Sequence, residues 1–275
     1  MLLFFLRSNN SVFADKPFRT EGLIGQQPRN HTSNTLPRAV FLAYGSGPMV
    51  AAVRRITREA NATGAFSVVH AFTNTDIDTK FASAHADVLQ QKRGGGYWLW
   101  KPYFVARVLA GLAEGELLFY ADAGCEFKGN PTPYLLLAHQ HGFLGFHQPP
   151  HMTMHVWTKG DIFSAVGLNS SVFGPKPQVI AGIFALRKSQ LSTAFVSYWL
   201  RLCTDLQLIS DAPSVEPNHA SFEESRHDMS IFSALFYKLK PGIAIPDETW
   251  PYENAPIIGA SRRRNDRRLQ TLLYK

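Results

Sequence analysis

Residues 116 to 126 read Glu-Leu-Leu-Phe-Tyr-Ala-Asp-Ala-Gly-Cys-Glu, an apolar run that ends in a carboxylate followed by two small residues. The run predicts a buried strand over 116–121, with Asp122 at the point where the strand ends. Open α/β sheets bind ligands at the carboxyl ends of their strands. A carboxylate there can hold a divalent cation, and Ala123 and Gly124 are small enough to let a phosphate approach the backbone. An isolated Asp-Ala-Gly is also an ordinary turn, so the surrounding segments must decide.

Strands and helices alternate on both sides of this stretch. An apolar run over 39–44 is followed by a Gly-Ser-Gly turn and then by a helical pattern over 50–60, which is the opening of a βαβ unit. Further strands are predicted at 66–72, 143–146 and 179–186, and further helices from Pro102, after a cap at Ser189, and over 229–239. The pattern predicts an α/β fold with a mostly parallel central sheet and helices on both faces. We expect a single domain over 38–275, preceded by an irregular arm over 1–37.

The charge of the chain is unevenly distributed. The formal net charge is +7, and five arginines lie in a basic C-terminal segment over 261–268. This placement favours an anionic partner at one site rather than a uniformly basic surface. The two cysteines are too few for a disulfide framework, and the apolar start over 1–6 is too short to span a membrane. We therefore expect a soluble, cytoplasmic protein without a membrane span. Four Asn-x-Ser/Thr matches keep the Golgi or ER lumen as the alternative, and the oligomeric state is not predicted.

Three ordered blocks carry a resemblance to a known family. They are Gly-Tyr-Trp-Leu-Trp-Lys-Pro-Tyr over 96–103 with the strand to Gly124, then Gln-Val-Ile-Ala-Gly-Ile-Phe-Ala-Leu over 178–186, and Arg-His-Asp-Met-Ser-Ile-Phe over 226–232. The blocks resemble nucleotide-sugar glycosyltransferases of the GT-A fold, which is Rossmann-like, and more loosely the small single-domain sugar transferases of bacteria and large algal viruses. The resemblance implies a hexosyl- or pentosyltransferase in glycan biosynthesis. Its donor would be a nucleoside-diphosphate sugar, a UDP-sugar by expectation, and its acceptor a hydroxyl of a glycan or glycoconjugate.

The resemblance also implies a donor site. Asp122 matches the first Asp of the Asp-x-Asp motif, which touches the donor ribose or a Mn²⁺ or Mg²⁺ ion. The second Asp is replaced by Gly124, which puts metal dependence in doubt; Glu126 on the same face, or the arginine cluster, could compensate. The donor-binding residues that we expect are Tyr44, Trp98, Lys101, Asp122, Ala123, Gly124, Gly182, Arg262 and Arg263.

Asp228 is the candidate catalytic carboxylate. At the start of a predicted helix, the helix dipole and the neighbouring Arg226 would keep it ionised. It would then act as general base in an inverting enzyme, or orient the acceptor in a retaining one. Helix capping alone is the ordinary alternative for an Asp in this position. His155 and His227 are the expected acceptor-binding residues.

Two other functions remain open. A sugar nucleotidyltransferase shares the nucleotide-binding half of the fold, but the Gly-containing loop over 43–48 lacks the basic residue that such enzymes carry there. A non-catalytic module could bind nucleic acid or another anion through Arg262 to Arg268. That module would have no use for the carboxylates or the Trp-rich segment, so we expect no nucleic-acid partner.

Overall fold

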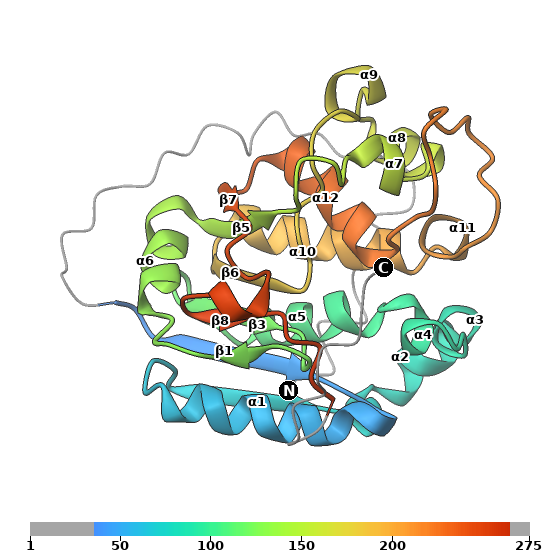
Figure 1. Ribbon diagram of the computed structural model, residues 1–275. Helices are drawn as coiled ribbons and strands as arrows, with labels where there is room; N and C mark the ends of the chain where they lie inside the picture. The colour runs from blue at the N-terminus through green and yellow to red at the C-terminus, as the bar shows by residue number, and fades with distance from the viewer. Residues whose placement is uncertain (1–35, 265–275) are drawn as a thin grey trace.

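The computed structural model describes residues 36–264 and is built around a central six-stranded sheet (Figure 1). The strand order is β2-β1-β3-β6-β5-β7. β1 pairs in parallel with β2 and β3, β5 pairs in parallel with β7, and β6 runs antiparallel to both of its neighbours. A second sheet joins β4 and β8. The strands are β1 (Ala39–Tyr44), β2 (Val68–Phe72), β3 (Leu117–Ala121), β4 (Glu126–Phe127), β5 (Phe143–His147), β6 (Ile183–Arg187), β7 (Ile243–Pro246) and β8 (Ile258–Gly259).

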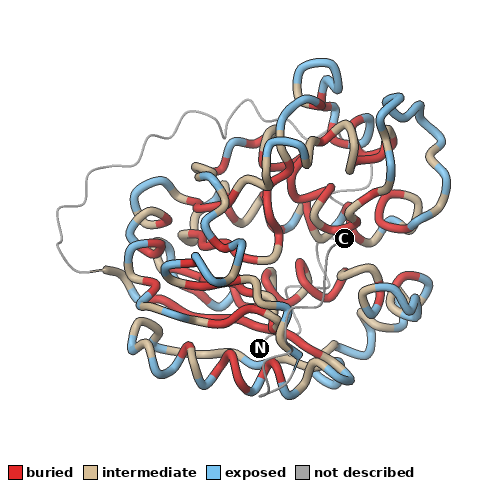
Figure 2. Tube along the Cα trace, viewed as in Figure 1, coloured by how far each residue is buried: buried red, intermediate tan, exposed pale blue. Residues whose placement is uncertain are grey.

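Alternate side chains of the strands feed two separate cores. In β1, Val40 and Leu42 point to one face of the sheet, and Phe41 and Ala43 point to the other. A strand buried on both faces has to be apolar at every position, which explains the uninterrupted apolar runs of β1 and β3. In Figure 2 the buried residues, drawn in red, follow the strands of the sheet and recur along the helices.

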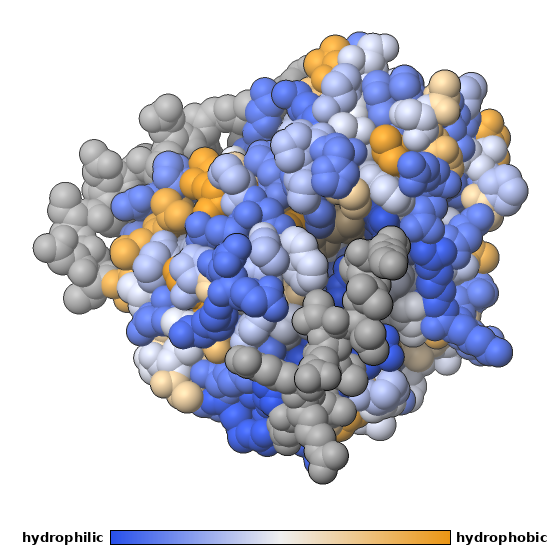
Figure 3. Space-filling model, viewed as in Figure 1, coloured by the Kyte–Doolittle hydropathy of each residue, from blue (hydrophilic) through white to orange (hydrophobic). Residues whose placement is uncertain are grey.

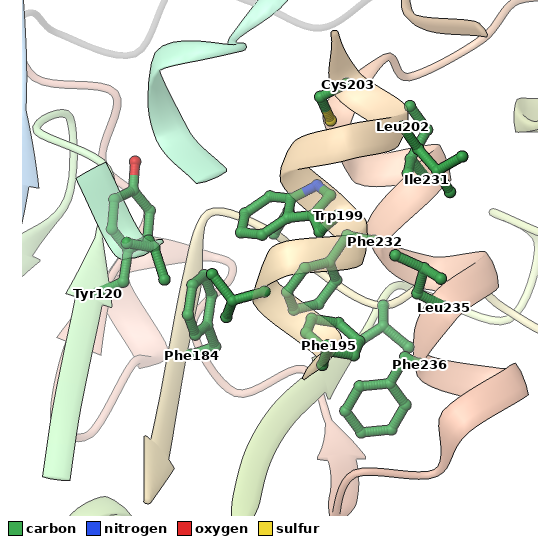
Figure 4. Packing of buried hydrophobic residues seen from close by; sticks show 14 of the residues in the cluster. Tyr120, Phe184, Phe195, Trp199, Leu202, Cys203, Ile231, Phe232, Leu235 and Phe236 are labelled. Carbon is green, nitrogen blue, oxygen red and sulfur yellow. The ribbon is translucent and has the colours of Figure 1, made fainter. Parts of the chain in front are cut away.

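The larger core lies between the sheet and a helical layer. α5 (Trp100–Ala110), α8 (Gly160–Val166), α10 (Gln190–Cys203) and α12 (Asp228–Leu239) contribute to it. Its centre is aromatic: Phe232 of α12 packs 5.2 Å from Phe184 of β6 and 4.9 Å from Trp199 of α10, measured between ring centroids (Figure 4). α10 begins after Ser189, whose hydroxyl accepts from the Ser192 amide, as the sequence predicts for this cap.

The opposite face of the sheet is covered by α1 (Val50–Ala62) and α6 (Thr132–His141), together with the small sheet β4–β8. The remaining short elements are η1 (Gly47–Met49), η2 (Asn74–Asp76), α2 (Thr79–Ala84), α3 (Ala86–Leu89), α4 (Gly94–Tyr97), α7 (Met154–Trp157), α9 (Ser170–Phe173), α11 (Leu206–Ile209) and η3 (Tyr252–Asn254). Helices therefore cover both faces of a mostly parallel sheet, which confirms the predicted fold class. On the face drawn in Figure 3 hydrophilic residues predominate, and the hydrophobic ones lie in small separate groups.

Two predicted strands have different limits. The strand expected at 66–72 begins at Val68, and the one expected at 179–186 begins at Ile183 and runs antiparallel. Residues 179–182 are not part of that strand because their backbone is used elsewhere: the Val179 amide donates to Ser233 Oγ at 2.9 Å.

The expected N-terminal arm lies outside the described residues except at 36 and 37, and the basic segment is described only as far as Arg264. Cys125 and Cys203 are buried and form no disulfide. Across residues 36–264, the helices are all too short or too polar to cross a bilayer.

Candidate active site

Asp122 lies where β3 ends, at the carboxyl edge of the central sheet. The chain turns sharply after it, since the Cys125 amide donates to the Asp122 carbonyl at 2.9 Å. The Tyr120 hydroxyl donates to Asp122 Oδ1 at 2.6 Å, and 39% of the Asp122 side chain is exposed. Asp122 is therefore held on one side and open to ligands on the other.

Gly182 leaves the space that this carboxylate needs. The Asp122 amide donates to the Gly182 carbonyl at 2.8 Å, so the two backbones are in direct contact. A Cβ atom at position 182 would lie 2.9 Å from Asp122 Oδ2, which is closer than real Cβ contacts. The predicted proximity of Gly182 to the site is thus explained by sterics.

Lys101 joins Asp122 to Asp228. Its Nζ lies 2.8 Å from Asp228 Oδ2 and 3.4 Å from Asp122 Oδ1, and only 4% of its side chain is exposed. Burial lowers the pKa of the ammonium, but attraction by Asp122 and Asp228 outweighs this effect and leaves the pKa above its usual value. The structure thus brings together three predicted site residues that are far apart in the sequence.

Asp228 is the first residue of α12 and is almost fully buried. The Trp199 indole donates to its backbone carbonyl at 3.0 Å. Burial raises the pKa of the Asp228 carboxyl to about 6, against the opposing effect of Lys101, and the charge of Asp122 raises it further. An aspartate poised in this range can both accept and release a proton near neutral pH.

The expected partner of Asp228 is corrected by the structure. Arg226 lies 3.2 Å from Glu224 Oε1, and its guanidinium stacks on the Trp157 ring at 3.9 Å. The chain reverses at His227, whose φ is 54°, so residues 226 and 228 point in different directions. Lys101, rather than Arg226, is the counter-ion of the catalytic candidate.

A left-handed segment leads into Lys101. The φ values of Gly94, Gly95 and Gly96 are 61°, 60° and 96°, and those of Tyr97 and Trp98 are 48° and 63°. Glycine adopts such angles without steric cost, whereas Tyr and Trp do so only when their surroundings hold them there. The segment turns the chain so that α5 starts at Trp100 with Lys101 directed into the core.

His227 holds the two aromatic residues of this segment. Its ring lies 4.9 Å from Tyr97 and 5.3 Å from Trp98, and its Nδ1 is 2.7 Å from the Ile209 carbonyl. The imidazole is only 3% exposed, so it supports the wall of the site. Contact with an acceptor stays a prediction for His227.

His155 lies in a different place. Its ring stacks on His219 at 3.7 Å, and both line a surface depression of about 480 Å³ together with Phe163, Asn169 and Glu216. None of the contacts described for His155 reaches Lys101 or the two aspartates. An acceptor role for His155 would require an acceptor long enough to extend from the carboxylates to this depression.

Residues 261–264, here called the C-terminal strap, cross the turn after Asp122. Ser261 Oγ and the Arg263 amide both donate to the Gly124 carbonyl, at 2.8 and 3.0 Å. The Arg263 guanidinium donates to Glu126 Oε1 at 2.5 Å. Glu126 is therefore paired within the scaffold, and the extended conformation that would place it on the same face as Asp122 does not continue, because the chain turns between them.

Arg55 of α1 binds the backbone of this turn. The sequence did not predict this role. Its Nη2 donates to the carbonyls of Ala123 at 3.0 Å and Cys125 at 2.9 Å, and its Nη1 donates to Glu59. Position 55 lies outside the apolar stripe of Val53, Ile56 and Ala60, so the helical pattern does not single out this arginine; its burial becomes visible only when α1 packs on the turn.

Tyr44 and the Trp residues complete the edge of the sheet. Leu42 is opposite Tyr120 in the parallel register, so Tyr44 and Asp122, each two residues later, end at the same level. Tyr44 is buried and stacks on Trp100 at 4.0 Å, and burial raises the pKa of its hydroxyl. The ring thus helps to form the floor of the expected donor site.

In the part of the chain that the structure describes, the side chains do not form the divalent-cation site of an Asp-x-Asp enzyme. Within residues 36–264, no three His, Cys, Asp or Glu side chains are grouped so that they could hold a metal ion. Position 124 has no carboxylate, Glu126 is paired with Arg263, and Asp122 Oδ1 already faces Tyr120 and Lys101.

Comparison with known proteins gives a likeness at the level of the fold. No family model matches the chain, and no curated protein matches it in sequence. Among solved structures, the glycosyltransferase GlyE from Streptococcus pneumoniae is 13% identical with a TM-score of 0.40, over 79% of this chain and 47% of that one. Mouse xyloside xylosyltransferase 1 is 10% identical with a TM-score of 0.42, over 78% and 86%.

A glucose-1-phosphate thymidylyltransferase from Bacillus anthracis is also similar, at 8% identity and a TM-score of 0.36 over 76% and 85% of the two chains. This chain spans less than half the length of GlyE. Two of the three structures are glycosyltransferases, the class that the sequence blocks resemble. Because all three scores are below 0.5, the function rests on the site and not on these likenesses.

Proposed function

We propose that the protein is a glycosyltransferase that moves a sugar from a nucleoside-diphosphate donor, a UDP-sugar, to a hydroxyl of a glycan or glycoconjugate. The observation that carries the proposal is the placement of Lys101 between Asp122 and Asp228. Asp122 lies at the sheet edge where nucleotides bind in open α/β folds, and Asp228 lies on the helix layer facing it. Sugar transfer can use one carboxylate that binds the donor and a second that accepts a proton, and here both contact the same ammonium.

The donor half of the site is formed by the ends of β1 and β3 and by the segments around them. The half-buried Trp98 offers an aromatic surface for a uracil or sugar ring, and the buried Tyr44 would shape the site through its packing on Trp100. Ala123 and Gly124 would bind the donor through their position beside Asp122, because the C-terminal strap fills the space at Gly124, and Gly182 lets the sugar approach Asp122. The backbones of Arg262 and Arg263 lie next to Gly124, and the Arg263 guanidinium is paired with Glu126.

Transfer can be written with these groups. The bond from the anomeric carbon to the diphosphate oxygen breaks, and its electron pair leaves with the diphosphate. The acceptor hydroxyl oxygen forms the new bond to the anomeric carbon, and Asp228 accepts the proton of that hydroxyl. In a retaining reaction the same carboxylate would orient the acceptor or stabilise the oxocarbenium-like transition state. The anomeric configuration of the product distinguishes the two reactions.

Thermal unfolding tests the proposal against its alternatives. A UDP-sugar at 100 times its Kd should stabilise the native state by about 2.7 kcal/mol. For a chain of this size that corresponds to a Tm increase of about 5 to 10 °C. Duplex DNA and RNA should cause no increase. Stabilisation by nucleic acid alone would support the anion-binding module instead, and turnover of UTP with a sugar 1-phosphate would support a nucleotidyltransferase.

A further inference from the structure

The turn after Asp122 has no second carboxylate to offer to a cation. A Cβ atom at position 124 would lie 3.2 Å from the Arg262 Cα, so a larger side chain there would press on the C-terminal strap. Glu126 faces Arg263 at 2.5 Å and Arg55 at 3.9 Å. Within residues 122–126, Asp122 is therefore the acidic residue that faces the site.

The position beside Asp122 already holds a cation. The Lys101 ammonium contacts one oxygen of each aspartate, and it is buried beside aromatic rings, with Nζ 5.7 Å from the centre of the Tyr120 ring. Attraction by both carboxylates keeps the ammonium protonated. The ammonium lies within ion-pair distance of both carboxylates, and lysine has three N–H donors that it can share between them and an oxygen of a ligand.

A divalent ion would compete with this ammonium. Mg²⁺ binds a carboxylate oxygen at about 2.0–2.1 Å. On Asp122 Oδ1 such an ion would lie next to Nζ, which is 3.4 Å from the same oxygen. Two cations that close in a buried site repel each other strongly. The ion pair and a metal on Oδ1 are thus alternatives, whereas the other oxygen, Oδ2, lies beside Gly182.

We propose that Lys101 is the resident cation of the donor site, and that by offsetting the negative charge of Asp122 and Asp228 it lets a donor diphosphate bind there without a divalent metal. This inference rests on the proposed function, because it assumes a nucleoside-diphosphate donor. Lys101 is fixed by two carboxylates on separate elements, β3 and α12. Its charge is therefore in place before the donor binds, so little reorganisation is needed.

Calorimetric titration with UDP provides the test. The wild-type protein should bind UDP with the same affinity, within twofold, after EDTA treatment and after addition of about 1 mM Mn²⁺. Divalent ions that proteins hold weakly have dissociation constants of up to about 1 mM, so this concentration would fill such a site. Lys101→Met, which keeps the length of the side chain and removes its charge, should bind UDP at least about tenfold more weakly. Lys92→Met is the matched control, because Lys92 is exposed nine residues earlier, and it should bind like the wild type.

Three results separate the outcomes. A loss of UDP affinity of more than about tenfold in EDTA, restored by Mn²⁺, would overturn the inference and leave the glycosyltransferase proposal standing. Unchanged UDP affinity in a folded Lys101→Met variant would also overturn it. If the wild-type protein bound neither UDP nor a UDP-sugar with or without Mn²⁺, the proposed function itself would fail. The metal comparison uses the wild-type chain, so it decides even if the variant does not fold.

Discussion

At the scale of single residues, three charged groups determine the chemistry. Asp122 and Asp228 share the Lys101 ammonium, but their surroundings differ: Asp122 is partly exposed and Asp228 is almost completely buried. Burial disfavours a charged carboxylate, so the pKa of Asp228 is raised into the range where proton transfer is efficient. Two aspartates on one lysine can therefore have separate functions, donor binding and proton acceptance.

Asp228→Asn separates these functions. The amide keeps the size of the side chain but cannot accept the acceptor proton, so kcat should fall about 100- to 10,000-fold. UDP affinity, which depends on Asp122 and Lys101, should change by less than about threefold. Steady-state kinetics and calorimetry measure the two quantities. Asp122→Asn is the complementary variant, with donor binding as the property lost; full activity in both would remove the proposed site.

The pH dependence of transfer follows from the raised pKa of Asp228. Below about pH 6 its carboxyl is protonated and cannot accept a proton, so kcat should fall tenfold per pH unit on the acid side. The contribution of the same group to stability has the opposite sign. The native state binds this proton more tightly than the unfolded chain, so its contribution to the free energy of unfolding decreases as pH rises from about 4 to about 6.

A pH profile of donor turnover checks this expectation, with circular dichroism at each pH to show that the protein stays folded. A kcat that stayed constant down to pH 4.5 in folded protein would mean that Asp228 does not accept the proton.

Gly182→Ala tests the steric fit beside Asp122. The new Cβ would approach Oδ2 to 2.9 Å, so the carboxylate would have to rotate away from its position. A displacement of about 1 Å can lower turnover about 100-fold, and we expect a loss of this size in kcat/KM. Gly111→Ala is the control, because the nearest atom to its Cβ would be the Val108 carbonyl oxygen at 3.5 Å. Equal kinetics in the two variants would rule out the steric role.

At the scale of elements, the strands could be predicted from the sequence more reliably than their contacts. β1 and β3 are apolar runs with clear ends, and Ser189 is a recognisable helix cap, so local chemistry was enough to identify them. The reversed direction of β6 depends on which strands it joins, and this is a long-range property. The same holds for Lys101: the sequence shows a lysine before Pro102, but the pairing with Asp228 depends on how α5 and α12 pack.

The Arg55 contacts are the element-scale feature that can be tested best. The Arg55 guanidinium connects α1 to the turn after β3 and to the strap, through the carbonyls of Ala123, Cys125 and Arg263. Arg55→Met would leave these acceptors and the nearby glutamates without their buried cation. We expect the free energy of unfolding to fall by about 3 to 5 kcal/mol.

Urea unfolding measures this loss, and Arg54→Met provides the control. Arg54 is exposed on the same helix, so its replacement should change stability by no more than about 0.5 kcal/mol. If the two variants had equal stability, Arg55 would not be the residue that fixes the turn.

At the scale of the whole molecule, the larger core keeps the two aspartates in register. Asp122 belongs to the sheet and Asp228 to the helix layer, and Phe232, one turn after Asp228, packs between these layers against rings of β5, β6 and α10. The distance between the carboxylates is therefore set by aromatic packing that neither local sequence pattern reveals.

Phe232→Ala should lower the free energy of unfolding by about 3 to 5 kcal/mol, because the rings around the fully buried side chain cannot collapse completely into the space it leaves. The variant should also lose kcat, since α12 carries Asp228 and is held against the sheet by this ring. Urea unfolding and donor turnover measure both effects. Val172→Ala, at a side chain that is 56% exposed, should change neither. A Phe232→Ala protein that lost stability but kept full kcat would show that Lys101 alone, through its two ion pairs, holds the carboxylates in place.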